Sequence, residues 1–593
     1  MSTNRRPRIA VLLDHIESEY PVTILNGILR AARLSRTRVV VIPGGWLPAS
    51  SDPPIARNFI YEFLRDAGFD GIVVLAGSLS NYCGVDPFRA WLRRLDGIPT
   101  VALGLAVEGV PSIYVDNGVG TYAAVTHLIR EHARRRIAFI AGPVRSWEAN
   151  ARLQAYKQAL EDNEITVDPR LIVAQNGLGR EEGLAGVATL LDDRRIALPA
   201  LNAIVAVNDD VALGAMEALH RRGIGVPDPV AVVGFDDTTN AGSANPPLMT
   251  VNQRVELQGY NAARALLDHL QGRLLVDERM EPELVIRASC GCSARDAYSS
   301  KLVSLPKGLA KSCRLALVER RATFLAEMSR AAAGRLSGAN GWEASLLDAL
   351  ASEMDPERGG KFVRQLERVV RQNAMLQHGL MACHDVLTTI RVQALQCAAA
   401  EPNLQPLLEE LFQEARIMVA RVSADVGREH RQAANLHLRV VTKSCINLAA
   451  AGTFADLDDV LQEHLPALGV AAFSIGRFVE SSGVTPNCEI IAHRSRGLTR
   501  RQSTLVPSFE VGLDASLDNE EMTIIEPLEF GSQPLGIAAF SWGAFDALMY
   551  EQLRELLGMA IYVGRNRGDA ARESALRGPA AQQNFIEGHS RVR

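Results

Sequence analysis

The sequence predicts an α/β protein with two lobes at its N-terminal side, then an α-helical region with coiled-coil character, and then a smaller α+β domain. Three observations predict this order. Short apolar runs alternate with amphipathic stretches between residues 8 and 290. Helical periodicity without strand-like runs follows until about residue 450, and strand-like runs return after residue 454. Alternation of strand and helix predicts a parallel sheet covered by helices on both faces.

Length and composition set the outer bounds of this prediction. The chain has 593 residues, of which 47% are hydrophobic and 22% charged, and at about 100–200 residues per domain it holds about three to five domains. The net charge of −5 gives no overall attraction to nucleic acid or anionic membranes. The apolar run before Asp14 is too short for a signal peptide, and no run is long enough to span a bilayer. We expect a cytoplasmic protein with no membrane contact.

The first domain, residues 1–295, is predicted from its apolar runs. They are rich in Val, Ile, Leu and Ala and end in Gly, Asp, Asn or Pro, as strands buried on both faces do. The predicted strands are 9–13, 39–42, 71–75, 100–103, 137–141, 203–207 and 230–234. The predicted helices between them are 22–35, 118–132, 148–163 and 209–222. The number of strands is too large for one small sheet, so two lobes with a cleft between them fit best.

Polar and aromatic side chains follow these predicted strands. A ligand of an open α/β sheet binds beyond the carboxyl ends of the strands, so the residues that come next in the chain form the predicted site. We expect them to orient a small polyol or heterocycle through directional hydrogen bonds. The predicted ligand-binding residues are Tyr20, Ser78, Trp147, Arg152, Asn208, Asp209, Asp236 and Gln253.

Five segments resemble successive signatures of the LacI/GalR regulators. They are residues 132–143, 152–156, 207–214, 225–237 and 246–253. The resemblance implies a two-lobed fold of the type 1 periplasmic-binding-protein class, which closes on a small effector such as a sugar or nucleobase. By position, it implies that Arg152 reaches into the cleft, that Asp236 is the acidic partner on the far wall, and that Asn208 and Asp209 form a polar pair.

The same resemblance places Tyr20 on the first loop and Gln253 at a crossover between the lobes. Other interpretations exist for the two central residues. Arg152 could pair with Glu148 on a helix surface, and Asp236 could cap a turn. The resemblance favours ligand contact for Arg152 and Asp236. For Tyr20, Ser78, Trp147 and Gln253, ligand contact and a purely structural role both stay open.

The LacI/GalR regulators carry a helix-turn-helix before this domain, and here only seven residues precede Arg8. We therefore expect no recognisable DNA-binding motif. Residues 117–120 offer a lone Gly-x-Gly, and neither a Walker A sequence nor a Gly-x-Ser-x-Gly elbow occurs. The sequence thus predicts a protein that is not an enzyme and that needs no cofactor or metal.

Cys290 and Cys292 close the first domain, and their role is left open. A Cys-x-Cys pair could bind metal or sense redox state, yet two thiolates are half of a tetrahedral zinc site, and no neighbouring His-x-x-Cys completes it. We favour the interpretation that Cys290 and Cys292 are simply two small residues at the edge of the domain. The Ser-Cys-Gly-Cys ending also resembles the end of sensor domains of this fold in bacterial multidomain signalling proteins.

The remaining chain is divided by its pattern. A linker is expected at 296–310, a helical region at 311–450, an α+β domain that resembles GAF domains at 451–567, and a disordered tail at 568–593. A heptad seam runs through Leu404, Leu408, Leu411, Ala415, Met418 and Val422. The seam predicts either a helix of a parallel dimer, prolonged by Leu436, Val440, Val441 and Ile446, or a helix packed inside a bundle.

Together these observations predict a small-molecule sensor and signalling protein that forms an allosteric homodimer. Its closure is relayed through a helical dimer to the GAF-like domain and a downstream partner protein.

 The alternatives are a LacI-type transcription regulator that acts on DNA directly or through a partner, and a degenerate subunit of a signalling enzyme. The first alternative needs a basic surface, which either the group Arg130, Arg134, Arg135 and Arg136 or the Arg-containing tail could supply.

Overall fold

The structure is a computed structural model in which two compact units are described in turn: residues 1–298 with 440–593, and residues 299–439. The described residues are 6–49, 51–198, 200–292, 316–317, 319–332, 336, 341–353, 361–373, 379–400, 404–423, 454–479, 487–495, 498–499, 505–507, 510–511, 521–543 and 547–576. The predicted linker 296–310 lies outside them, as do the predicted seam residues Leu436, Val440, Val441 and Ile446.

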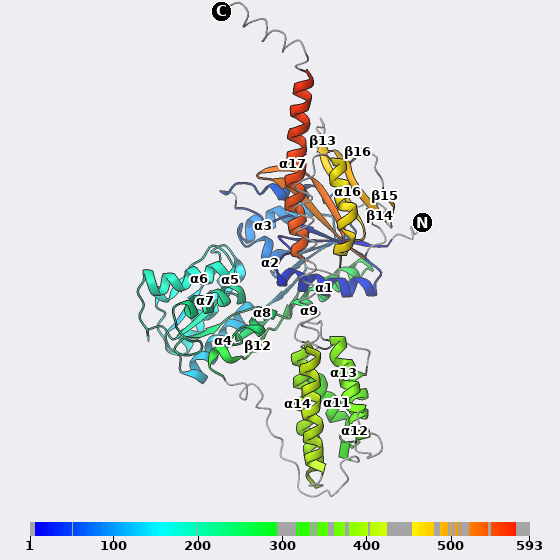
Figure 1. Ribbon diagram of the computed structural model, residues 1–593. Coiled ribbons are helices and arrows are strands. Elements are labelled where there is room, and N and C mark those ends of the chain that lie inside the picture. The colour runs from blue at the N-terminus through cyan, green and yellow to red at the C-terminus, as the bar shows by residue number, and fades with distance from the viewer. Residues whose placement is uncertain are drawn as a thin grey trace, which may run out of the picture. The chain divides into compact units, whose positions relative to one another are not determined.

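The first lobe is a parallel sheet with helices on both faces (Figure 1). Its strands are β1 (Arg8–Leu13), β2 (Arg38–Pro43), β3 (Gly71–Leu75), β4 (Thr100–Leu103), β5 (Ser112–Val115) and β11 (Glu278–Met280). Its helices are α1 (Glu19–Leu34), α2 (Ala76–Leu79), α3 (Val85–Leu92) and α9 (Val255–Leu270). The strands are buried because both faces are covered, which explains their continuous apolar sequence.

Helices α1 and α9 approach each other closely, and the approach depends on glycine. A Cβ atom added to Gly27 would lie 2.0 Å from the carbonyl oxygen of Glu256, and one added to Gly259 would lie 2.2 Å from that of Ile24. Any larger side chain at either position would force the two helices apart. The close packing of α1 and α9 therefore holds α9, with which the chain returns from the second lobe, against the first lobe.

The second lobe repeats the α/β arrangement with four parallel strands in the order β7-β6-β8-β9. These are β6 (Ile137–Ile140), β7 (Ile172–Val173), β8 (Ala203–Ala206) and β9 (Ala231–Val233). Its helices are α4 (Asn117–His132), α5 (Trp147–Asp162), α6 (Arg180–Ala188), α7 (Asp209–Arg221) and α8 (Thr239–Ser243), and a small ribbon joins β10 (Thr250–Asn252) to β12 (Glu283–Val285). The two-lobed α/β prediction is confirmed for about half of the chain.

The third domain is an antiparallel sheet with two helices against one face (Figure 1). Its strands are β13 (Phe473–Val479), β14 (Asn487–Ser495), β15 (Leu498–Thr499), β16 (Leu505–Pro507), β17 (Met522–Phe530) and β18 (Gln533–Ser541), and its helices are α16 (Phe454–His464) and α17 (Leu548–Leu576). The helix α17 continues past residue 567, where the sequence predicts the start of a disordered tail. The resemblance to GAF domains stays a prediction.

The third domain shares its sheet with the first lobe, which the sequence did not predict. Strand β17 pairs in parallel with β2, with Val40 opposite Thr523, and the combined sheet has 12 strands. Arg33 forms an ion pair with Glu521 at 2.8 Å beside this junction. Edge strands expose unpaired backbone groups, so pairing β2 with β17 satisfies both edges and merges two hydrophobic cores into one.

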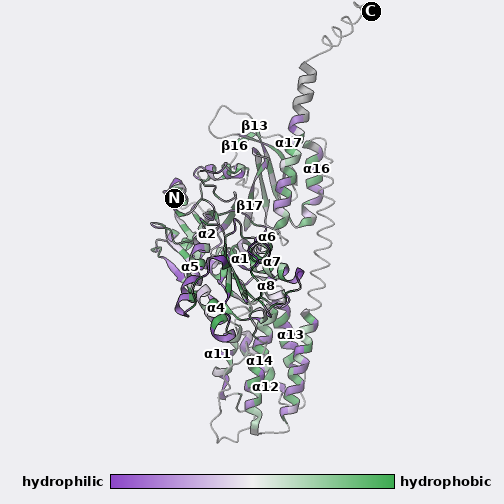
Figure 2. Ribbon diagram, turned by 90° about the vertical axis from the view of Figure 1, so that its left-hand side faces the viewer, coloured by the Kyte–Doolittle hydropathy of each residue, from purple (hydrophilic) through white to green (hydrophobic). Residues whose placement is uncertain are grey.

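The second unit is a helical bundle. Its described helices are α11 (Arg321–Ala332), α12 (Trp342–Glu353), α13 (Lys361–Asn373), α14 (Gly379–Cys397) and the helical residues 404–423. In Figure 2 these labelled helices carry hydrophobic and hydrophilic residues together, as amphipathic helices do when one face packs inward.

The predicted heptad seam packs inside this bundle. Phe412 and Val419 are buried there, one position beyond the predicted seam residues Leu411 and Met418. The ring of Phe412 lies 5.7 Å from that of Phe362. The structure therefore favours the bundle alternative, and dimerisation through this helix stays a prediction. None of the helices among the described residues has both the length and the hydrophobicity that crossing a membrane requires.

Candidate functional site

Arg152 lies where the carboxyl ends of the second-lobe strands face the first lobe. Its side chain is buried, and its Nε donates a hydrogen bond to Asn117 Oδ1 at 2.9 Å. One Nη donates to the carbonyl oxygen of Val207 at 2.6 Å, and the guanidinium lies 3.8 Å from the centre of the Phe235 ring. These contacts hold a positive charge in one orientation, which lowers the entropic cost of binding a ligand.

Asp236 is held in a turn directly after β9. Its φ of +123° is a conformation that residues other than glycine rarely adopt, and the adjacent Asp237 has a φ of +60°. One Asp236 carboxylate oxygen accepts a hydrogen bond from Gln253 and lies 3.8 Å from a guanidinium nitrogen of Arg152. Burial raises the pKa of Asp236 to about 7, although Arg152 and Gln253 act to lower it. At neutral pH this carboxyl can therefore accept or donate a hydrogen bond.

The first lobe contributes Tyr20 to the same region. Burial, together with the nearby charges of Glu148 and Asp236, raises the pKa of the Tyr20 phenol well above 10, so the phenol keeps its proton. Ser78 lies on α2 in the first lobe, where its hydroxyl donates to the carbonyl oxygen of Leu75 at 3.4 Å. A Cβ atom added to the neighbouring Gly77 would lie 3.1 Å from the Glu148 carboxylate of the second lobe. The two lobes therefore meet closely at this point.

Two sets of contacts join the lobes at the edge of this region. The Glu19 carboxylate accepts hydrogen bonds from the backbone N–H of Thr239 at 2.9 Å and from its hydroxyl at 2.7 Å. Arg145 of the second lobe lies 3.7 Å from Asp52 of the first lobe. Both sets of contacts form only when the lobes are close, so they stabilise a closed arrangement.

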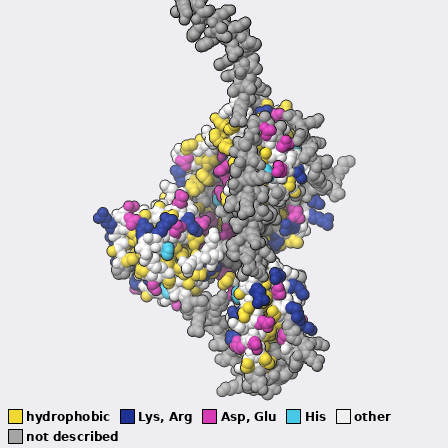
Figure 3. Space-filling model, viewed as in Figure 1, with side chains coloured by type: hydrophobic (Ala, Val, Ile, Leu, Met, Phe, Trp, Pro, Cys, Tyr) yellow, Lys and Arg dark blue, Asp and Glu magenta, His cyan; other side chains and the backbone are white. Residues whose placement is uncertain are grey.

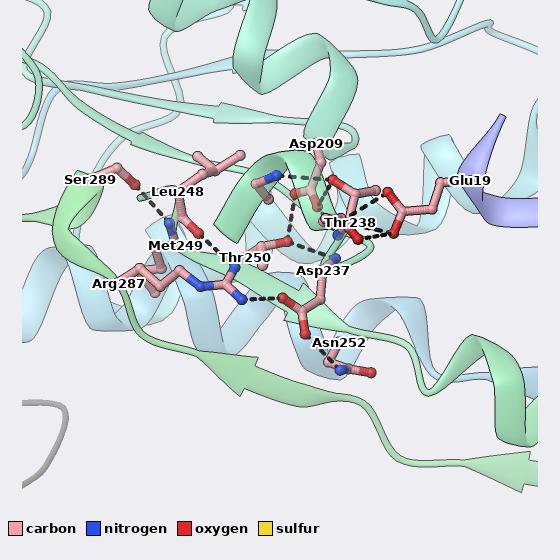
Figure 4. Close-up of polar contacts among 12 residues, drawn as sticks. Glu19, Asp209, Asp237, Thr238, Leu248, Met249, Thr250, Asn252, Arg287 and Ser289 are labelled. Atoms are coloured by element: carbon pink, nitrogen blue, oxygen red, sulfur yellow. Dashed lines mark hydrogen bonds and ion pairs between the residues drawn. The ribbon is translucent and has the colours of Figure 1, made fainter. Parts of the chain in front are cut away.

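Asn208 and Asp209 have local partners in the second lobe. Asn208 caps α7 by accepting from the backbone N–H of Val211 at 2.9 Å. Asp209 is fully buried, and its carboxylate accepts hydrogen bonds from Thr238 and Thr250 (Figure 4). These contacts position the turn that carries Asp236.

Trp147 begins α5, and 38% of its surface is exposed. The structure brings Arg152, Asp236, Gln253 and Tyr20 together. Asp209 supports the turn that carries Asp236 through Thr238 and Thr250, whereas Asn208 caps α7. The ligand contacts predicted for all eight residues stay predictions.

Two side chains of this region were missed in the sequence. Asn117 orients Arg152. It follows the end of β5, so the same pattern of polar residues after strands could have identified it. Glu148 was considered only as a surface partner of Arg152. Burial raises the pKa of Glu148, while Arg152 and Asn117 act to lower it. Its position in the first turn of α5 gave no signal that the other lobe would cover it.

The arginines suggested for DNA contact are held by their own lobe. Arg134 forms an ion pair with Asp228 at 2.7 Å, and Arg135 donates to the carbonyl oxygen of Glu164 at 3.0 Å. A cavity of about 310 Å³ lies beside them, at the amino end of β6, and none of the predicted ligand-binding residues lines it. On the face shown in Figure 3, Lys and Arg side chains of the second lobe are interspersed with Asp and Glu.

Comparisons with known proteins find a matching domain family and similar proteins. Residues 125–290 match the family described as periplasmic binding protein-like domain. The HTH-type transcriptional regulator CelR of Thermobifida fusca is 37% identical over 233 residues, which are 38% of this chain and 65% of that protein. The HTH-type transcriptional repressor CytR of Escherichia coli K12 is 34% identical over 240 residues, which are 39% of this chain and 66% of that protein. This chain thus spans just under two thirds of the length of these relatives.

Among solved structures, a transcriptional regulator CelR–cellobiose complex is 30% identical to this chain, with a TM-score of 0.41. The match covers 48% of this chain and 85% of that one.

Proposed function

We propose that this chain is a sensor of a small polyhydroxylated effector, because about two fifths of it is similar to the regulators CelR and CytR and residues 125–290 match a periplasmic binding protein-like domain. The effector binds between the lobes, where Arg152 and Asp236 form bidentate hydrogen bonds with neighbouring hydroxyl groups. Phe235 and Tyr20 supply aromatic surface for a sugar-like ring. The buried pair of Arg152 and Asp236 is the observation that carries this proposal.

The strained turn at Asp236 supports the same conclusion. Holding a residue other than glycine at a φ of +123° costs conformational free energy. Residues in such strained conformations are concentrated at ligand sites. The contacts of Glu19 with Thr239 add a means of closing the lobes over a ligand. An effector shifts this equilibrium only by binding the closed arrangement more tightly, which typically contributes about 1–3 kcal/mol.

The signal of closure passes to the third domain through the shared sheet. Strand β2 belongs to the first lobe and is hydrogen-bonded to β17 of the third domain. A change in the first lobe is therefore transmitted to that domain without an intervening flexible segment. The relay through a helical dimer that the sequence predicts is the alternative path. In this proposal the protein regulates a partner and catalyses no reaction.

Thermal-shift titration of the full chain with sugars and nucleosides tests the proposed site. We expect at least one compound to raise the melting temperature, and we expect Arg152→Ala and Asp236→Asn to abolish that shift. Arg130→Ala, on the outer side of α4, is the matched control and should retain it. Undiminished binding by both site variants would place the effector elsewhere.

Regulation of transcription is the second candidate function, because the two curated relatives are HTH-type transcriptional regulators. Gel-shift measurements over a range of salt concentrations distinguish it. Sequence-preferring binding with a steep salt dependence would support direct DNA contact. We expect no such binding from the second lobe, since Arg134 and Arg135 are engaged by their own chain.

A further inference from the structure

Four potential metal ligands meet at the end of the first domain. His127 and His132 come from the last turns of α4, and Cys290 and Cys292 come from the segment in which the chain leaves the second lobe. One ligand atom of each residue lies within 4.8 Å of all the others. These four residues, which we name the Cys2His2 cluster, are separated by as many as 165 positions in the sequence.

The distances within the Cys2His2 cluster match those of a tetrahedral zinc site. Zinc binds sulfur at about 2.3 Å and nitrogen at about 2.0–2.1 Å, so the tetrahedral angle places sulfur and nitrogen about 3.5 Å apart. The Sγ atom of Cys290 lies 3.6 Å from His127 Nε2. The Sγ atom of Cys292 lies 3.5 Å from His127 Nε2 and 3.3 Å from His132 Nε2.

The backbone between the two cysteines brings both thiols to the same side. Gly291 has a φ of +114°, which glycine adopts readily and other residues rarely do. A Cβ atom added there would lie 3.0 Å from His132 Nδ1. The Cys-Gly-Cys sequence therefore fits the turn and the close approach of the histidine ring.

The donor set also has the chemistry that zinc prefers. Two thiolates and two neutral imidazoles form a Cys2His2 set, which is common among structural zinc sites. Binding of one zinc ion would release the two thiol protons, and the two thiolate charges would balance the charge of the metal. No net charge would then be buried beside the hydrophobic core that contains Cys290.

Neighbouring contacts indicate what such a site would do. Arg287 donates to the Asp237 carboxylate at 2.6 Å, and the Ser289 hydroxyl accepts from the backbone N–H of Met249 at 2.8 Å (Figure 4). Asp237 directly follows Asp236 of the candidate effector site. The segment from Arg287 to Cys292 is thus attached to the turn that carries Asp236 as well as to α4.

We propose that the Cys2His2 cluster binds one structural zinc ion that fastens the end of the sensor domain to helix α4. This site is separate from the effector site and does not depend on the proposed function. The zinc ion would hold the segment that ends in Cys292 in place against α4, so that this end of the domain does not fray.

The test is metal analysis of the full chain, purified under reducing conditions and without chelators. We expect about one zinc ion per chain in the wild-type protein and in Cys83→Ser, a control at a buried cysteine of the first lobe. We expect less than about a tenth of that in Cys290→Ser/Cys292→Ser. After removal of the metal, added Co(II) should give the d–d and thiolate charge-transfer absorption of a tetrahedral site.

Hydrogen exchange supplies a second readout. Chelation of zinc from the wild-type protein should speed exchange in residues 287–292 about tenfold or more, with no change in β3 of the first lobe. If the double cysteine variant does not fold, His132→Gln at the end of α4 takes its place and should weaken zinc retention against a chelator about 10–100-fold.

Three results would overturn the proposal. They are wild-type protein that neither contains zinc nor gives the cobalt spectrum, undiminished zinc in the variants, and a Cys290–Cys292 disulfide in the reduced preparation.

Discussion

Replacing Glu526 by glutamine should reduce the dependence of third-domain stability on pH. Glu526 lies in β17 and is fully buried, and neither of its carboxylate oxygens has a hydrogen-bond partner among the residues that the structure describes. Arg554 is close, but it is already paired with Glu551 and Glu529. Arg57, which comes from the first lobe, lies 3.8 Å from Glu529 and 3.6 Å from Glu551. Three carboxylates therefore share two guanidinium groups.

The magnitude follows from the pKa of the buried carboxyl. Burial, with the charge of Glu551, raises the pKa of Glu526 from 4.5 to about 8. Because the folded state holds the proton more tightly than the unfolded state, the stability from this group is complete below pH 4.5 and is lost as the pH rises to about 8. Between pH 5.5 and 7.5 the loss is about 2–3 kcal/mol, at 1.36 kcal/mol for each unit of pKa.

Urea unfolding at pH 5.5 and 7.5, followed by hydrogen exchange in peptides of β17 and β18, measures this loss locally. The wild-type protein should lose about 2–3 kcal/mol more than Glu526→Gln over this range. The comparison between pH values removes the constant cost of burying the new amide. Glu510→Gln, at an exposed position of the third domain, is the matched control and should behave as the wild type. Equal pH dependence in Glu526→Gln and the wild type would refute the argument.

Three further predictions concern the first two lobes. Burial raises the pKa of Asp236 to about 7, so ionisation of this carboxyl costs stability as the pH rises from about 4 to 7. Without ligand at pH 8, Asp236→Asn should therefore melt at a higher temperature than the wild type. A lower melting temperature would contradict this. Glu19→Gln weakens the hydrogen bonds from Thr239 by about 1 kcal/mol and should lower the affinity for the effector about fivefold, measured by calorimetry. Unchanged affinity would show that this contact does not stabilise the closed arrangement. Gly27→Ala places a methyl group against the Glu256 carbonyl and should destabilise the first lobe by about 1–3 kcal/mol in chemical denaturation; an unchanged midpoint would show that α1 and α9 are not so close.

Much of the fold of the first two lobes could be predicted, because its elements are defined locally. The predicted strand at 203–207 is β8 (Ala203–Ala206), and the predicted helix at 209–222 is α7 (Asp209–Arg221). An apolar run between turn residues identifies a buried strand without knowledge of its partners. The helical seam shows where local pattern stops being sufficient. Leu411 and Phe412 are both apolar, and only the packing against Phe362 decides that Phe412 faces inward.

The sequence by itself determined the two-lobed α/β architecture and the position of Arg152 and Asp236 after their strands. Long-range packing is needed to establish that β2 pairs with β17, that Glu526 is buried with no hydrogen-bond partner in the described part of the chain, and that His132 meets Cys292 across 160 positions. Periodicity and turn chemistry are properties of neighbouring residues, so they can be recognised in a single sequence. Contacts between distant segments depend on how whole elements pack, and no local pattern records which edge or helix end will be adjacent.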